Sequence, residues 1–172
     1  AWPIMRSMRL DFRDGRFDEG EPTAVRTVRD LREIWQTEPD PADDRVVYRT
    51  YGLPGADQDQ PDLLYASTVI EPGDVHGEYF MTRGHFHVKS ERGEWMLTLR
   101  GCGALVLRDR AGKSWSEPLS LGSVNLIDGR FAHRVVNTGI EPLVFVVTWL
   151  ADCGHDYETI HREGFGLRMN RT

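Results

Sequence analysis

Four side chains with metal-binding chemistry lie in the middle and later parts of this sequence. His85 and His87 are separated by one residue, and in a strand the side chains at i and i+2 point to the same face. Both imidazoles can therefore reach one point. Glu94 follows after six residues, and we expect an antiparallel return strand to bring its carboxylate beside the histidines. His133 opens a later strand and offers a third imidazole.

Three imidazoles and one carboxylate form a mixed nitrogen and oxygen donor set. Such a set suits iron, manganese, nickel, cobalt or zinc better than calcium. Four protein ligands leave room for substrate oxygens if the geometry is octahedral. A histidine in a strand is often only a hydrogen-bonded structural residue, so the prediction of one divalent transition metal per chain depends on the complete set: His85, His87, Glu94 and His133.

Short β-rich runs separated by turn residues must position these side chains. Turn sequences such as Glu71-Pro72-Gly73 and Asp128-Gly129 lie between successive runs. This spacing is typical of an all-β sandwich or barrel whose neighbouring strands are mostly antiparallel. The expected strands cover residues 64–70, 79–87, 94–100, 104–108, 124–127, 133–137 and 143–149.

The first part of the chain has a different pattern. A short helix is expected at residues 28–36, with Thr27 as its N-cap and with Leu31, Ile34 and Trp35 on its buried face. A strand near residues 46–51 and a polar loop at 55–62 follow. We expect residues 1–44 to form an extension packed on a barrel of residues 45–172, because a chain of 172 residues with 40% hydrophobic residues suits one domain.

Composition excludes several classes of partner. The formal net charge is −6 and the basic residues are scattered among acidic ones, so we expect no binding to nucleic acid. Cys102 and Cys153 are too few for a disulfide framework and form no Cys-x-x-Cys pair, which fits a reduced cytoplasm. Nowhere does the chain approach about 18 consecutive apolar residues, and we expect neither a signal peptide nor a membrane span.

The spacing of the histidines and glycines resembles the two sequence motifs of the cupins. A resemblance to this family implies a double-stranded β-helix, also called a jelly-roll barrel. Two features depart from the general pattern: the gap between His87 and Glu94 is longer than in most cupins, and Asp128 and Arg130 replace a proline and a glycine. The matching positions are His85-x-His87, Glu94 and Gly101, followed by Gly122, His133 and Asn137.

The longer gap closely resembles that of the cupin-type glucose-6-phosphate isomerases, known mainly from archaea and found in some bacteria. The resemblance implies a homodimeric enzyme that interconverts glucose 6-phosphate and fructose 6-phosphate with a bound metal, for which iron is the first candidate. It extends over most of the chain through Thr82-Arg83-Gly84-His85-Phe86-His87-Val88-Lys89, Val46-Val47-Tyr48, Ser67-Thr68-Val69, Ala132-His133-Arg134 and Ala151-Asp152-Cys153-Gly154-His155-Asp156-Tyr157.

The same resemblance implies roles for individual residues. The metal is expected on His85, His87, Glu94 and His133, and the phosphate group of the sugar on Thr68, Thr82 and Gly84, with positive charge from Arg83 or Lys89 nearby. His155 is expected to contact the substrate, with Tyr157 on the same side if the segment is extended. Two tyrosines that line the sugar site in the family are replaced here by Met96 and Trp149.

This set of residues leads to a mechanistic hypothesis. The metal polarises the oxygens on C1 and C2 of the sugar while Glu94 moves a proton between the two carbons. A metal-assisted hydride shift is the alternative. Two other functions remain open: an iron-dependent cupin dioxygenase with the same three histidines and one glutamate, and a non-catalytic sugar-binding cupin.

Overall fold

The computed structural model describes residues 8–18, 20–52 and 63–171. The predicted loop at 55–62 lies outside the described residues. Most of the described chain forms β-strands, and every ladder between named strands is antiparallel. In the described parts of the chain, no helix has the length and apolar character needed to cross a membrane.

The largest element is a six-stranded sheet. Strands distant in the sequence lie side by side in it, since β12 pairs with β3 on one side and with β7 on the other. In order across the sheet, its strands are β1 (Ala24–Thr27), β2 (Val46–Gly52), β3 (Leu63–Ile70), β12 (Leu143–Leu150), β7 (Glu94–Arg100) and β10 (Val124–Ile127).

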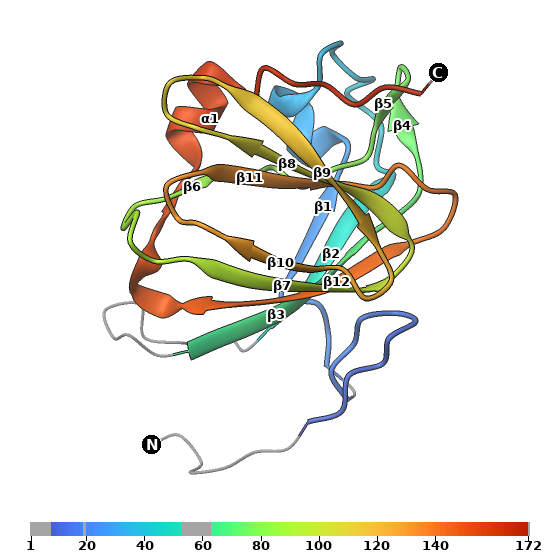
Figure 1. Ribbon diagram of the computed structural model, residues 1–172. Helices are drawn as coiled ribbons and strands as arrows, with labels where there is room; N and C mark the ends of the chain where they lie inside the picture. Colours follow the sequence, from blue (N-terminus) through green and yellow to red (C-terminus); the bar gives the residue numbers. More distant parts are fainter. Residues whose placement is uncertain (1–7, 19, 53–62, 172) are drawn as a thin grey trace.

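A three-stranded sheet lies across from β7, β10 and β12 (Figure 1) and consists of β11 (Ala132–Val136), β8 (Cys102–Arg108) and β9 (Ser114–Ser120). The main core contains Phe86, Met96, Leu105 and Phe145, which come from both sheets and from β6. Strand β8 is buried along nearly all of its length, and apolar residues occupy both of its faces. The fold therefore places two sheets around one apolar interior.

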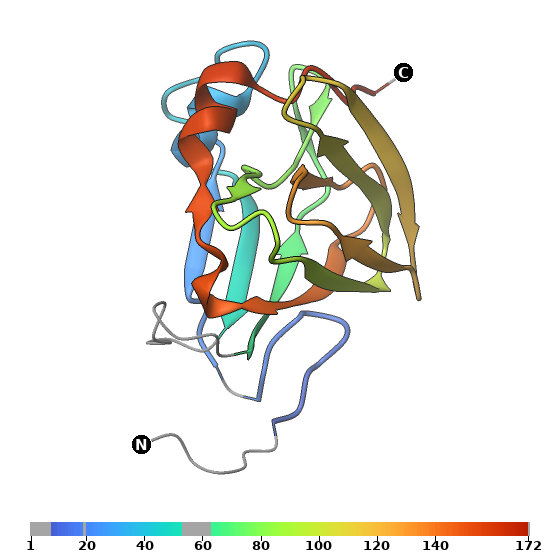
Figure 2. The ribbon, with the colours of Figure 1, turned by 60° about the vertical axis from the view of Figure 1, so that its left-hand side comes forward.

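Two small ladders and three short helices complete the described structure. The C-terminal segment runs along one side of the molecule, and Figure 2 shows α1 beside η1. These elements are β4 (Asp74–Val75) paired with β5 (Glu78–Tyr79), β6 (Phe86–His87) paired with β13 (His155–Asp156), the 3-10 helices η1 (Arg29–Ile34) and η2 (Ala151–Cys153), and α1 (Tyr157–Glu163).

The predicted helix at residues 28–36 is present as the shorter 3-10 helix η1. Leu31, Ile34 and Trp35 are buried, as predicted. The Asp30 N–H donates to Thr27 Oγ1 at 3.2 Å and the Thr27 N–H donates to Asp30 Oδ2 at 2.9 Å, a reciprocal capping arrangement. The helix is not a regular α-helix because Leu31 has non-helical dihedral angles, with φ at −111° and ψ at 17°.

Two strand predictions were wrong. The run at 79–87 is interrupted, because Gly84 has φ at +78° and only single bridges, including one between His85 and His133, connect the chain between β5 and β6. Strand β9 was missed, since its sequence is mostly polar and contains Pro118. This strand forms the edge of its sheet, where a missing backbone N–H is tolerated.

Candidate metal centre

A single backbone bridge places two of the imidazoles side by side. The His85 N–H donates to the His133 carbonyl at 3.3 Å, and the His133 N–H donates to the His85 carbonyl at 3.1 Å. The centroids of the two rings are 4.5 Å apart. A short connection across the structure thus joins residues 48 positions apart in sequence.

His87 is oriented by the loop that follows it. Its Nδ1 lies 2.5 Å from the carbonyl oxygen of Arg92, so Nδ1 carries the proton and donates, and Nε2 keeps a free lone pair. The ring stacks on that of His85, with 5.5 Å between centroids and 19° between planes. The prediction that the two side chains of the His-x-His pair lie on one side is confirmed.

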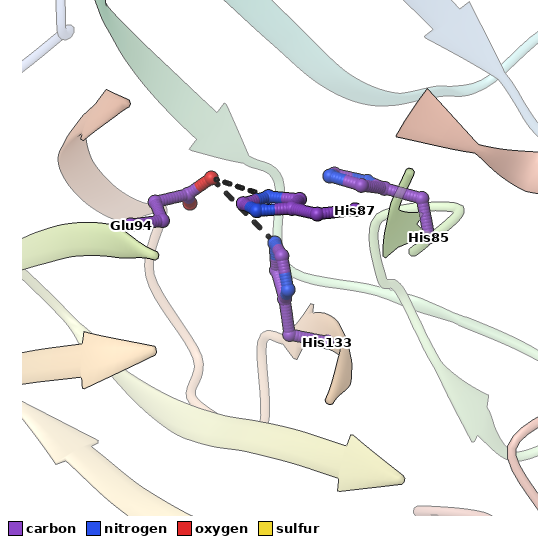
Figure 3. Close-up of side chains that lie close together, drawn as sticks. All are labelled: His85, His87, Glu94 and His133. Carbon is purple, nitrogen blue, oxygen red and sulfur yellow. Dashed lines mark ion pairs between the residues drawn. The ribbon is translucent and has the colours of Figure 1, made fainter. Parts of the chain in front are cut away.

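Glu94 reaches the histidines by a different route from the one predicted. It begins β7 in the six-stranded sheet, where it lies opposite Ile127 and Trp149. No return strand beside β6 forms, because β6 pairs with β13 instead. The carboxylate reaches across the interior (Figure 3), with Oε2 at 3.7 Å from His87 Nε2 and 3.6 Å from His133 Nε2.

The positions and hydrogen bonding of the four side chains support a bound cation, independently of their residue types. One donor atom from each lies within 4.8 Å of the others. His85 Nε2, His87 Nε2 and both ring nitrogens of His133 are buried with no hydrogen-bond partner in the described part of the chain. Leaving such atoms unpaired costs about 1–3 kcal/mol each, and coordination of a metal ion would offset that cost.

The electrostatics of the group also suit a cation. Burial alone would raise the pKa of Glu94, but the nearby His133 and His87 imidazoles outweigh it and hold the pKa well below its usual range. Burial lowers the pKa of His85 well below its usual value, and the neighbouring His133 adds to this effect. One ionised carboxylate and neutral imidazoles are the forms in which these residues bind metals.

His87 is the favoured position for a proton when no cation is bound. Burial lowers its pKa, yet the Glu94 carboxylate and the Arg92 carbonyl outweigh burial and the net pKa is raised. A bound cation would take the place of that proton beside Glu94.

A cavity of 290 Å³ adjoins this cluster. A wider groove of 820 Å³ also touches Glu94 but is lined by none of the three histidines. The smaller cavity is lined by three residues of the cluster, His85, Glu94 and His133, and by every residue predicted to contact substrate: Thr68, Thr82, Gly84, His155 and Tyr157. Their contacts with a ligand stay predictions.

Threonine hydroxyl groups that line the cavity have protons to donate. Thr82 Oγ1 accepts a hydrogen bond from the Val135 N–H at 3.0 Å, so its own proton is free for an acceptor in the cavity. The hydroxyl oxygens of Thr50 and Thr68 are 3.3 Å apart. Such donors suit an anionic group with several oxygens.

Sequence reasoning missed three polar residues that line this cavity. Arg26 lies on β1, and Tyr48 and Thr50 lie on β2. The two β2 residues are separated by one position, so alternation along the strand could have placed them on one face. Nothing in the sequence indicates Arg26, because its position follows only from the pairing of β1 with β2.

The two candidates for positive charge near the phosphate differ. Arg83 lines the cavity and forms an ion pair with Glu33, with 2.8 Å between Nη2 and Oε1. Lys89 is absent from the residues lining the cavity, and its Nζ binds Asp152 Oδ2 at 2.7 Å. Of the two candidates, Arg83 is the one that lines the cavity, and its contact with a phosphate group stays a prediction.

His155 and Tyr157 lie close to the metal cluster. Their ring centroids are 4.4 and 5.2 Å from that of His85. Tyr157 begins α1 and is not part of an extended segment, yet both side chains line the cavity. Met96 and Trp149 form part of the same wall, so an apolar surface stands where the family resemblance implies tyrosines.

The architecture defines the class of protein. The structure is similar to that of an oxalate oxidase, with a TM-score of 0.52 and 15% identity over 66% of this chain and 56% of that one. An oxalate decarboxylase matches with a TM-score of 0.51 and 21% identity over 78% of this chain and 28% of that one. These likenesses show the fold alone: the chain has the cupin fold, as predicted.

Sequence comparison gives the family within that class. Residues 25–170 match the family described as "Glucose-6-phosphate isomerase (GPI)", and the chain belongs to this family. A glucose-6-phosphate isomerase of Pyrococcus horikoshii is 38% identical over 92% of this chain and 85% of that protein. A putative glucose-6-phosphate isomerase 2 of Rhizobium meliloti is 31% identical over 92% and 82% of the two chains.

Proposed function

We propose that this protein is a metal-dependent aldose-ketose isomerase that interconverts glucose 6-phosphate and fructose 6-phosphate. The main observation is the convergence of four donor side chains beside one cavity that also carries hydroxyl groups and two arginines. Relatives named glucose-6-phosphate isomerase, at 31–38% identity over 92% of the chain, support the same reaction here.

The four clustered side chains would hold one divalent transition metal, with iron preferred and manganese, nickel, cobalt or zinc as alternatives. When bound, such a cation supplies Lewis-acid polarisation of the sugar oxygens at C1 and C2. The hydrogen bond from His87 Nδ1 to the Arg92 carbonyl keeps the ring in one orientation and one tautomer. The residues concerned are His85, His87, Glu94 and His133.

We assign the proton transfer to Glu94. Its lowered pKa keeps the carboxylate ionised at neutral pH, so it can accept a proton from one carbon and return it to the next. Its Oε2 lies near the imidazoles, and its second oxygen is the candidate for the proton. A hydride shift between C1 and C2 would instead bypass the carboxylate.

The remaining walls would hold the rest of the sugar. The phosphate group is expected against Thr68, Thr82 and Gly84, and Arg26 and Arg83, which line the same cavity, would supply positive charge. This anchor provides binding energy remote from the reacting carbons and fixes their orientation.

His155 and Tyr157 line the same cavity, and their ring centroids are 4.4 and 5.2 Å from that of His85. We propose that they contact the sugar near C1 and C2. The alternative is that His155 is a structural residue at the end of the barrel. In that case, replacing His155 would leave substrate binding unchanged.

We also propose that the chain is a single domain and acts as a homodimer in the cytoplasm. The pairing of β1 with β2 supports a single unit, since it joins residues 24–27 of the N-terminal extension to the main sheet. Light scattering on purified protein tests the dimer, for which a monomeric mass is the contrary result.

A coupled assay with glucose 6-phosphate and metal-loaded protein tests the proposed activity. Isomerisation is the expected result. Oxygen uptake without isomerisation would indicate the dioxygenase, and sugar-phosphate binding without turnover would indicate a non-catalytic cupin. In deuterated water, proton transfer incorporates solvent hydrogen into the product, whereas a hydride shift does not.

Glu94→Gln tests the assigned carboxylate directly. Three imidazoles remain, so we expect metal still to bind, while turnover falls about 10²- to 10⁴-fold, the usual contribution of a general base. Glu91→Gln is the matched control, because Glu91 is an exposed residue of the loop that precedes β7. Near-normal turnover of Glu94→Gln would remove Glu94 from the mechanism.

A further inference from the structure

A second group of donor side chains shares one histidine with the first. His87, Cys153 and His155 each offer one ligand atom, and these atoms lie within 4.8 Å of one another. Cys153 Sγ is 3.9 Å from His155 Nε2. His87 Nε2 is buried and has no hydrogen-bond partner in the described chain, and it is the ring nitrogen left with a lone pair because Nδ1 is bound to the Arg92 carbonyl.

The backbone holds the three residues in place. β13 pairs with β6 so that His155 lies directly opposite His87. Gly154 has φ at +63°, which lets the chain turn between Cys153 and His155. The Lys89 N–H donates to the Cys153 carbonyl at 2.9 Å. The arrangement is therefore part of the fold and does not depend on the rotation of exposed side chains.

Cys153 has no role in the proposed isomerisation. The thiol is completely buried, and burial raises its pKa to about 11, so it is neutral in the metal-free protein. A thiolate is a softer ligand than a carboxylate, and together with two imidazoles it favours thiophilic cations such as Zn²⁺ and Cd²⁺. On binding, the S–H proton would leave to solvent and a sulfur-metal bond would form.

The separation of Cys153 Sγ and His155 Nε2 is close to that of tetrahedral coordination. Bonds of about 2.3 Å to sulfur and about 2.0–2.1 Å to nitrogen imply a sulfur-nitrogen separation of roughly 3.6 Å. The observed 3.9 Å between Cys153 Sγ and His155 Nε2 requires only a small inward movement. His87 Nδ1 is committed to the Arg92 carbonyl, which leaves one lone pair on the ring, and one lone pair serves one cation at a time.

We propose that His87, Cys153 and His155 form a second metal site that takes Zn²⁺ or Cd²⁺ and excludes a cation from the four-residue site. The two sites compete because both need His87 Nε2. A thiophilic ion bound here also occupies His155, which the proposed function places against the sugar. Excess Cd²⁺ would therefore act as an inhibitor that replaces the working metal.

Titration of the metal-free protein with Cd²⁺ tests the sulfur ligand in the absence of substrate. We expect ultraviolet thiolate-to-cadmium absorption that saturates at one equivalent per chain, and an X-ray absorption spectrum of the Zn²⁺ form with one sulfur neighbour at about 2.3 Å. Cys153→Ala should lose both signals. Cys102→Ala is the matched control, since Cys102 is the exposed cysteine, and it should keep both.

The wild-type measurement decides the proposal even if a variant fails to fold. A Zn²⁺ spectrum with only nitrogen and oxygen neighbours in the wild type would overturn it, as would sulfur signals that survive in Cys153→Ala. The inference does not rest on isomerase activity, because every readout is spectroscopic.

Competition between the two sites has its own readout. Protein loaded with Mn²⁺ should release it on addition of Cd²⁺, seen as the electron paramagnetic resonance signal of free Mn²⁺. Cys153→Ala should need at least about tenfold more Cd²⁺ for the same release. Simultaneous binding of both ions would overturn the shared role of His87. Failure of Mn²⁺ to bind, with the thiolate absorption intact, would refute the four-residue centre but support this second site.

Discussion

Gly84→Ala tests how tightly the fold holds the metal cluster. Gly84 precedes His85 and has φ at +78°, a conformation that costs other residues about 1–2 kcal/mol. A Cβ atom there would lie 2.6 Å from a ring carbon of Phe165 and 2.9 Å from the His133 carbonyl oxygen. The substitution therefore presses on the backbone bridge between His85 and His133.

The magnitude follows from these two effects. Crowding of a packed interior costs about 1–3 kcal/mol, which together with the backbone conformation gives a loss of about 2–5 kcal/mol in the free energy of unfolding. Phe165 cannot move freely, because the guanidinium carbon of Arg134 lies 4.4 Å from the centroid of its ring. Arg134 is buried and also donates to the Arg83 carbonyl at 2.6 Å.

Gly122→Ala separates the two effects. Gly122 has φ at +86°, and its added Cβ would meet no atom of the described residues within 4 Å. We expect it to cost only the backbone part, about 1–2 kcal/mol. The assay is urea unfolding of the metal-free variants. If the free energy of unfolding depends on urea concentration as steeply in both variants as in the wild type, both still unfold in the same way.

Metal affinity gives a second readout of the same pair. Because Gly84→Ala displaces the His85–His133 bridge, we expect it to weaken metal binding at least about tenfold, whereas Gly122→Ala should leave affinity unchanged. The reasoning is refuted if the two variants differ by less than about 0.5 kcal/mol in unfolding free energy, the usual scatter of neutral substitutions, and bind metal equally.

Three further predictions concern the metal, pH and a buried amide. Chelation should abolish isomerase activity and added iron or manganese should restore it; activity of fully metal-free protein would contradict this. Hydrogen bonds from Arg92 and Lys89 lower the pKa of Asp152 to about 2, so its stabilising contribution is complete above its unfolded pKa of about 4 and is lost as the pH falls toward 2. With Asp152→Asn, the urea midpoint should therefore fall less steeply as the pH is lowered over that range. An unchanged dependence of the midpoint on pH would exclude a stabilising role of the Asp152 carboxylate. Buried Asn137 donates to two backbone carbonyls and accepts from one N–H, so Asn137→Ala should cost about 2–4 kcal/mol in urea unfolding, and a loss below the lower value would contradict the prediction.

The sequence by itself determined the β-rich fold class and most of the strands. Alternation of side chains along a strand is a local property, so the His85-x-His87 pair could be assigned to one side without knowledge of the fold. The motif spacing and the family resemblance identified the cupin fold and the isomerase family, and the matches to known proteins confirm both.

Strand prediction from local hydrophobic alternation failed where polar or irregular segments form part of the sheets. Strand β9 (Ser114–Ser120) has no apolar alternation because it is an edge strand with several exposed residues. The segment before β6 reads as a continuous strand, but Gly84 breaks it. These errors arise because hydrophobic periodicity reports burial, and an edge strand or a bridge can form with little of it.

Only the tertiary structure decided which distant residues meet. Glu94 comes to the histidines from the opposite sheet, Arg26 reaches the cavity through the pairing of β1, and Cys153 lies beside His155 and His87 because β13 pairs with β6. A sequence shows the face on which a side chain stands, but not the strand that will lie beside it. That choice depends on how the two sheets pack around the shared core, which is a property of the whole chain.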